Sequence, residues 1–178
     1  MKLAFVALCM LVANQAKAAL LIEPYVGYGM GKAEGILMTN ISSYNDSYVT
    51  TATMFGGRVG IAIPLLFVAA DYSMMTGTAK NGVLSYNISG TTIGAIAGVS
   101  IPFLRVWAGY NFSKTFKEIT EAKGKGLRAG IGFTGLPFIS INLEYMTTTY
   151  EKSSLQTAAT GDANDSFALL SISLPMEF

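Results

Sequence analysis

Hydrophobic and polar residues alternate along eight stretches of the chain, each about ten residues long. A period of two is typical of β-strands that have one apolar and one polar face. Short turns and longer polar connections separate these stretches in regular alternation. We predict strands at residues 21–30, 53–63, 66–74, 90–101, 103–112, 126–135, 138–146 and 167–176.

A repeat supports this division into strands. Four similar segments end in Pro64, Pro102, Pro137 and Pro175, at spacings of 38, 35 and 38 residues. After each of the first three prolines, an apolar-rich run leads to a tyrosine eight residues further on. The repeating unit is therefore an alternating stretch, a tight turn with proline, a second alternating stretch and a polar loop.

The connections between the strands alternate in length. Those at the first three prolines are a few residues long, whereas the others are long and rich in Asn, Ser, Thr, Gly and Lys. The long ones are predicted at 31–52, 75–89, 113–125 and 147–166. An even number of such strands, with short turns at one end and long loops at the other, is typical of outer-membrane barrels. We predict an all-β fold, an eight-stranded antiparallel up-and-down transmembrane β-barrel.

The two faces of the predicted strands differ in charge. One face carries no charged residue, and the other carries six charges and most of the strand glycines. Eight strands leave an interior only wide enough for side chains to fill, and small residues thin the polar face where large ones would clash. We therefore place the polar face inside and the charge-free face against lipid. The predicted lumen charges are Glu23, Arg58, Asp71, Arg105, Arg128 and Glu144.

Arginines and carboxylates balance in this predicted lumen. Arg58 and Asp71 lie six residues before and seven after Pro64, so they should face each other across a hairpin. One interpretation is a proton or ion relay, or a gate. We favour a structural plug of paired charges that closes the lumen, because a buried unpaired charge is costly.

Tyrosines mark one level of the outward face. Eight residues at roughly 3.3 Å each, tilted by about 40°, raise three tyrosines about 20 Å above the proline turns. That is the height of the far membrane interface, where aromatic rings gather. We predict an aromatic girdle of Tyr28, Tyr72, Tyr110 and Tyr145.

One strand is out of phase with this pattern. Counted from the proline turns, the polar-face residues of three other strands fall at even offsets, whereas Arg128, Gly130 and Gly132 fall at odd ones. We predict a bulge or a one-residue-longer turn at Gly135.

The first eighteen residues have the features of a secretory signal peptide. Lys2 precedes an apolar run, and Ala16 and Ala18 form the small-x-small pattern that signal peptidase accepts. The run is too short for a membrane anchor. We predict cleavage after Ala18, so that residues 19–178 form the barrel domain and contain no cysteine.

The C-terminus carries the most specific motif. Outward positions alternate along its last residues, namely Leu170, Ile172, Leu174, Met176 and Phe178. This pattern looks like the terminal signal that the outer-membrane insertion machinery recognises. With the signal peptide, the eight strands and the opening Glu-Pro-Tyr-x-Gly-Tyr-Gly at 23–29, the chain resembles the small outer-membrane proteins of the OmpA-barrel and OmpX type. Pro175 departs from the motif, and we expect it to affect the pairing at the strand end.

The resemblance covers residues 19–178. It implies location in the bacterial outer membrane and dependence on periplasmic chaperones and on the insertion machinery. It does not imply one activity, because function in this fold lies mostly in the loops.

Charge and composition exclude several classes of function. A net charge of +1 offers no basic surface for nucleic acid. The chain has no histidine, so it lacks the general base of the protease, deacylase and palmitoyltransferase sites known on outer-membrane barrels. Zinc or haem ligation by His or Cys is equally excluded in the mature chain. We predict no catalytic residue, no cofactor and no metal.

Two of the predicted loops carry candidate contact residues. The first has a mix of apolar, aromatic and small polar residues suited to adhesive contact, with Ile36, Leu37, Met38, Tyr44 and Tyr48. The third is rich in lysines suited to lipopolysaccharide phosphates, with Lys114, Lys117, Lys123 and Lys125 beside Glu118 and Glu121. The sequence identifies no loop ligand.

We therefore predict a monomeric, non-enzymatic outer-membrane barrel that contributes to envelope integrity or surface contact, with membrane lipids and lipopolysaccharide as partners. The alternative is a narrow channel for small solutes or ions, which requires a continuous water path past the lumen charges. A third interpretation is a soluble secreted ligand-binding barrel with an apolar interior.

Overall fold

The computed structural model describes residues 18–34, 47–82, 84–117, 121–150 and 163–178. Within these ranges the chain is almost entirely β-strand. None of the described residues forms a helix that is long and apolar enough to cross a membrane. The strands are β1 (Ala19–Glu34), β2 (Ser47–Ile63), β3 (Leu66–Asn81), β4 (Leu84–Ile101), β5 (Leu104–Lys117), β6 (Glu121–Phe133), β7 (Ser140–Tyr150), β8 (Ala163–Ser173) and β9 (Met176–Glu177).

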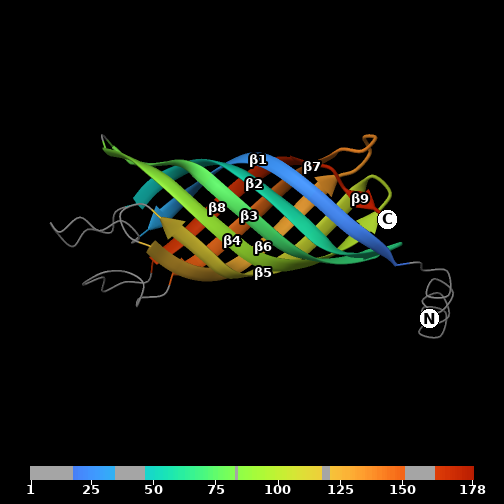
Figure 1. Cartoon of the computed structure of the whole chain (residues 1–178). Coiled ribbons are helices and arrows are strands. Elements are labelled where there is room, and N and C mark those ends of the chain that lie inside the picture. The colour runs from blue at the N-terminus through green and yellow to red at the C-terminus, as the bar shows by residue number, and fades with distance from the viewer. Residues whose placement is uncertain (1–17, 35–46, 83, 118–120, 151–162) are drawn as a thin grey trace, which may run out of the picture.

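The strands close into a single barrel (Figure 1). Each of β1 to β7 pairs antiparallel with the next strand in the chain, and β8 returns to pair with β1. The short β9 pairs with β1 and continues the line of β8 beyond a two-residue break. The prediction of an eight-stranded antiparallel up-and-down barrel is therefore confirmed.

The strands extend well beyond the lengths predicted at the loop end. The clearest correction concerns residues 75–89, which were predicted as a long polar loop. Here β3 continues to Asn81 and β4 begins at Leu84, with Gly82 at a φ of 55° in the turn between them. These residues alternate between polar outward and small or apolar inward positions, and their richness in Ser, Thr and Asn hides the strand pattern.

The connection between β6 and β7 is longer than the other two turns. The last paired residues are Ile63 and Leu66 in the first turn, but Phe133 and Ile141 in the third. A longer turn at Gly135 is therefore observed, but seven residues separate its last pair against two in the first turn, so it is longer than the one extra residue predicted. The register shifts of the sheet lie elsewhere, after Ile93 on β4 and between Asn111 and Lys114 on β5.

Proline interrupts the strand that closes the barrel. β8 ends at Ser173 and pairing resumes at Met176, so the break falls at Leu174 and Pro175, as expected from the sequence. The register of pairing with β1 is the same before and after this break. The Leu174 N–H still donates to the Pro24 carbonyl at 3.0 Å.

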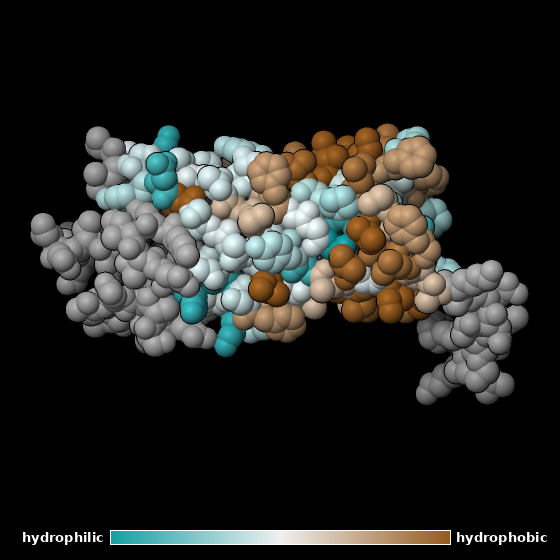
Figure 2. Space-filling view, viewed as in Figure 1, coloured by the Kyte–Doolittle hydropathy of each residue, from teal (hydrophilic) through white to brown (hydrophobic). Residues whose placement is uncertain are grey.

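Outward-facing residues change character along the barrel axis. At the turn end they are large and apolar, up to Met74 and Phe112 just above the tyrosines, whereas nearer the loop end they are mostly Ser, Thr, Asn and Lys. Figure 2 shows apolar side chains gathered over the turn-end half and a paler, more hydrophilic surface toward the loop end. The predicted girdle tyrosines point outward, and so do the C-terminal motif residues Leu170, Ile172, Leu174, Met176 and Phe178.

Candidate functional site

A belt of charged side chains crosses the lumen in its turn-end half. It is formed by Glu23 (β1), Arg58 (β2), Asp71 (β3), Arg105 (β5), Arg128 (β6) and Glu144 (β7), and each of these residues is at most 5% exposed. The structure thus brings together all six lumen charges that the sequence placed on one face. We call this group the charge belt.

Arg58 is the hub of the charge belt. Its Nε donates to Asp71 Oδ2 at 3.1 Å, and its Nη1 donates to Glu23 Oε1 at 3.2 Å. Its Nη2 donates to Glu144 Oε1. Asp71 is also the residue opposite Arg58 in the β2–β3 register, as the sequence spacing predicted. One guanidinium therefore contacts all three carboxylates.

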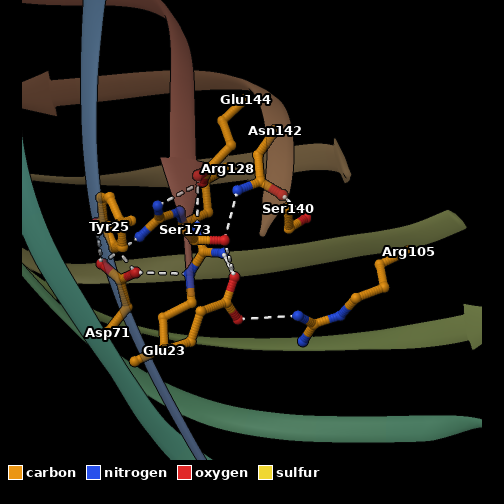
Figure 3. Close-up of polar contacts among 10 residues, drawn as sticks. Glu23, Tyr25, Asp71, Arg105, Arg128, Ser140, Asn142, Glu144 and Ser173 are labelled. Carbon is orange, nitrogen blue, oxygen red and sulfur yellow. Dashed lines mark hydrogen bonds and ion pairs between the residues drawn. The ribbon is translucent and has the colours of Figure 1, made fainter. Parts of the chain in front are cut away.

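Two further arginines complete the belt (Figure 3). Arg128 lies 2.5 Å from Asp71 Oδ1 through Nη1 and 2.5 Å from Glu144 Oε2 through Nη2. Arg105 Nη1 donates to Glu23 Oε2 at 3.0 Å. Each carboxylate thus contacts two arginines, and three positive charges balance three negative ones.

Neutral groups hold the carboxylates from both sides. The Tyr25 hydroxyl lies 3.2 Å from each oxygen of Asp71. On the other side, the Ser173 hydroxyl donates to Glu23 Oε1 at 2.7 Å and accepts from Asn142 at 2.9 Å. Figure 3 shows this line of polar groups continuing to Ser140. Fixed donors of this kind offset part of the cost of burying charge.

Aromatic rings cover the arginines. The Arg58 guanidinium lies 4.8 Å from the ring centroid of Tyr25 and 4.9 Å from that of Trp107. Arg105 lies 4.1 Å from the ring of Phe67. Such cation–π contacts strengthen when water is excluded, as it is here.

Apolar side chains close the lumen on both sides of the belt. Toward the turn end lies a cluster of Leu21, Ala62, Phe67, Ala69, Ile96 and Trp107. Toward the loop end lies a larger cluster, which includes Met54, Met75, Ile88, Met146, Tyr150, Phe167 and Leu169. All of these residues are at most 6% exposed. The described lumen is therefore filled by side chains at three successive levels.

Inward glycines make room for these large side chains. A Cβ at Gly130 would lie 2.4 Å from the Trp107 ring, and one at Gly29 would lie 2.4 Å from the Phe167 ring. The strand glycines that thin the polar face thus face bulky partners on neighbouring strands, which is how eight strands can enclose a tryptophan and a phenylalanine.

A second ion pair lies near the loop end of the lumen. Lys114, 3% exposed, pairs with Asp165 Oδ2, and the Tyr150 hydroxyl donates to the same oxygen at 2.7 Å. Burial, reinforced by the Asp165 carboxylate, raises the pKa of the Tyr150 phenol well above its ordinary value. The phenol therefore remains a donor to Asp165 at neutral pH.

This second pair corrects the prediction for the third loop. Lys114 was expected at the surface. The register shift between Asn111 and Lys114 reverses the faces beyond Asn111, so that Lys114 points inward as Asn111 does. Tyr48, expected in an adhesive loop, is likewise a buried residue of β2. Lys123 and Lys125 do face outward and are exposed.

The other predicted residues fall into two groups. Lys117 and Glu121 lie in β5 and β6. Several predicted residues lie outside the described part of the chain, namely Ala16 of the predicted signal peptide, Ile36, Leu37, Met38, Tyr44 and Glu118. In the described ranges no group of three His, Cys, Asp or Glu is placed to hold a metal ion.

Some of the site was missed at the sequence level. Tyr25 shares the inward parity of Glu23, two residues earlier, so the alternation could have marked it. Lys114 could not be found in this way, because the irregularity before it breaks the period of two. Most of the apolar lumen residues were also missed, since stretches such as Phe67–Val68 are apolar on both faces.

Comparison with known proteins supports the fold. No protein-family model and no curated protein matches the chain. Among solved structures it is similar to Ail, the attachment invasion locus protein of Yersinia pestis, at 13% identity and a TM-score of 0.52, covering 88% of this chain and 99% of that chain. It is also similar to Neisserial surface protein A, at 16% identity and 0.52, covering 91% and 99%.

A further structure gives the membrane context of one neighbour. The backbone structure of Ail in a phospholipid bilayer nanodisc matches at 10% identity and a TM-score of 0.52, over 90% of this chain and 100% of that chain. At identities this low the similarity shows the fold. The chain has the fold of small eight-stranded outer-membrane β-barrels.

Proposed function

We propose that the protein is a monomeric integral outer-membrane barrel with a closed lumen, which acts through its outer surface and not as a conduit or an enzyme. The observation that carries this proposal is the charge belt held between two apolar layers. Water and ions would have to displace all three levels to cross the barrel.

The belt argues against the channel interpretation. A pore needs charged groups that face water and exchange partners with passing ions. Here each carboxylate contacts two arginines, and Arg58 and Glu144 are each about 1% exposed. Removing one member would leave a buried charge without compensation, at a cost of several kcal/mol, about 3–5 for pairs of this kind. The belt therefore favours a fixed structural plug.

The outer surface supports a role in membrane contact. Above the girdle, most exposed outward positions form a collar of small polar residues and lysines: Lys32, Thr76, Lys80, Ser85, Asn87, Ser89, Lys123, Lys125, Thr149 and Asn164. Among the described residues, Glu34 and Val49 are the exceptions at this height. Lysines at this height suit the phosphates of lipopolysaccharide. Ail has been solved with the heparin analogue sucrose octasulfate, which is also a polyanionic sugar. We propose that the collar binds phosphorylated glycolipid.

Conductance tests the closed lumen. We expect the purified protein in planar bilayers to give no steady single-channel steps, and to show a heat-dependent mobility shift in SDS. Steady steps that the Asp71→Asn variant abolishes would overturn the plug. Mature protein that stays in solution without detergent would overturn the membrane assignment and point to an apolar ligand carrier.

Lipopolysaccharide retention tests the collar. The double variant Lys32→Gln, Lys80→Gln should retain less lipopolysaccharide during detergent purification than the original protein. Lys114→Gln is the matched control, because this lysine is inside the barrel and should not change retention. Equal retention by all three proteins would contradict the proposal for the collar and would leave the proposal of a closed lumen unaffected.

A further inference from the structure

The turns at the closed end of the barrel are apolar and exposed. Each has a large hydrophobic residue at its tip, directly after its proline. These residues are Leu65 at 46%, Phe103 at 67% and Phe138 at 87% exposure. Each lies seven residues before a girdle tyrosine, so the three tips share one level. We call them the turn tips.

Turn geometry does not explain the two phenylalanines. Phe103 has a φ of 68° and Phe138 a φ of 62°, both in the left-handed region. Glycine or asparagine adopts this conformation readily, whereas a bulky residue does so at a cost. Both rings are mostly exposed, so they gain little packing against the barrel itself. Their surroundings outside the protein are the remaining source of stabilisation.

The height of the lipid-facing band identifies those surroundings. The outward apolar positions end at Met74 on β3 and Phe112 on β5, and polar residues follow. Counted from Leu65 and Phe103, the band is nine residues long. At about 3.3 Å per residue and a tilt of about 40°, it is roughly 23 Å tall. The apolar band of outer-membrane barrels is about 25 Å tall. Including the turn tips therefore brings the band closer to this height.

The aromatic residues differ between the two ends of the band. At the loop side the outward rings are tyrosines, whose hydroxyl groups suit lipid head groups. At the turn side the described outward residues include Phe and Leu but no Tyr or Trp. Figure 2 shows that apolar side chains dominate the turn-end half on the face in view. Phe and Leu are typical of the acyl-chain region.

Among the described residues, the outward-facing charge at this end lies on the short β9, which pairs with β1. Glu177 is exposed and pairs with Leu21, and Phe178, the last residue, pairs with Leu20. The three turns themselves carry no charge, from Ile63 to Leu66, from Ile101 to Leu104 and from Phe133 to Ser140. Head groups and water therefore have a place beside β9, while the turn tips suit acyl chains.

We propose that the three turn tips insert into the acyl chains of the periplasmic leaflet and fix the depth of the barrel in the membrane. The inference rests on the membrane insertion proposed above. Its ligand is the hydrocarbon of phospholipid. A periplasmic protein that covers the same tips is the competing outcome of the test.

Single tryptophan probes test the depth of the tips. Trp107 is the only tryptophan, and its indole N–H donates no hydrogen bond within the described structure, so Trp107→Phe is a suitable background. Phe103→Trp and Phe138→Trp would be placed in phosphatidylcholine vesicles. We expect short-wavelength emission, loss of emission with lipids brominated on the acyl chains, and little loss with aqueous iodide.

Two control probes separate the possible failures. Ile93→Trp lies within the band and should be quenched by acyl-chain bromine, whereas Val49→Trp lies in the collar region and should be quenched by iodide. If the Ile93→Trp variant is not quenched by lipid, insertion itself fails. If it is quenched by lipid but the tip variants respond to iodide, the tips lie in water and only the present inference is overturned.

A second variant tests the tips without a probe. Phe103→Asn with Phe138→Asn removes both rings and suits the left-handed backbone, so the barrel should fold normally in detergent. In vesicles its urea midpoint should fall, because the apolar anchor is gone. Equal midpoints of variant and original protein in vesicles would overturn the inference.

Discussion

The two halves of the barrel are built with opposite polarity. In the turn-end half the outside is apolar and the inside holds the charge belt. In the loop-end half the outside is the polar collar, and the inside is a cluster that includes Met75, Ile88 and Phe167. The same strands run through both halves, as Figure 1 shows. Outward residues therefore change from apolar to mostly polar just above the tyrosines, while the interior changes from the charge belt to a mainly apolar cluster with one buried ion pair.

The difference shows that the outside medium sets the polarity of each half. In lipid, apolar side chains cost nothing outside, and the interior can be polar if its groups are paired. In water, an apolar interior supplies the hydrophobic stabilisation that an ordinary barrel needs. The loop-end half is thus a water-facing barrel stacked on a membrane barrel, and each half should respond differently to the same kind of substitution.

The largest effect is expected at the hub of the charge belt. Arg58→Met keeps much of the side-chain volume but leaves three buried carboxylates to two arginines. We expect the free energy of unfolding to fall by about 3–5 kcal/mol, measured by urea titration in lipid vesicles. Lys80→Met, in the exposed collar, is the control and should change it by less than about 0.5 kcal/mol. An unchanged midpoint for Arg58→Met would show that the belt is not tightly coupled.

A lysine placed on the outer surface should distinguish the two halves directly. Leu143 is 55% exposed within the apolar band, and Thr76 is exposed in the collar. Leu143→Lys should cost about 2–4 kcal/mol, since it brings a charge into hydrocarbon. Thr76→Lys should be nearly neutral. Urea midpoints in vesicles measure both, and equal costs would mean that the membrane boundary is misplaced.

The second ion pair should contribute less than the belt. Lys114→Met leaves Asp165 with the Tyr150 hydroxyl as its remaining partner among the described residues. We expect a loss of about 2 kcal/mol in the free energy of unfolding. The outward Lys32→Met, in the exposed collar, is the matched control. A loss as large as that of Arg58→Met would contradict the distinction between the two ion sites.

The smallest effect is expected from the Tyr150 hydroxyl and depends on pH. Tyr150→Phe removes one hydrogen bond, at a cost of about 1 kcal/mol at pH 7. The folded-state pKa of this phenol lies above its unfolded value of 10.0, so its contribution is present below about pH 10 and is lost as the pH rises further. Urea unfolding at pH 8 to 11 should show a shallower alkaline loss for Tyr150→Phe. Parallel curves for both proteins would contradict the shift.

The alternation of apolar and polar residues with a period of two determined which features of the fold and the site could be predicted. The eight strands, the outward tyrosines and the paired Arg58 and Asp71 all follow from a period of two and from turn positions. The extended strands at the loop end were missed, because Ser-rich and Thr-rich segments resemble loops when lipid no longer selects apolar residues. Lys114 was misplaced because a register shift reverses the faces, and a single sequence does not mark such shifts.

The charge belt also bears on how the barrel closes. Its ion pairs join strands that are not neighbours: Arg105 on β5 reaches Glu23 on β1, and Arg58 on β2 reaches Glu144 on β7. The seam between β1 and β8 is tied in by Ser173, which is 150 residues from Glu23 in the chain. An open sheet can form every hairpin but none of these cross-barrel pairs. Closure therefore gains all of them together, which makes the final step of folding cooperative and a half-closed barrel unstable.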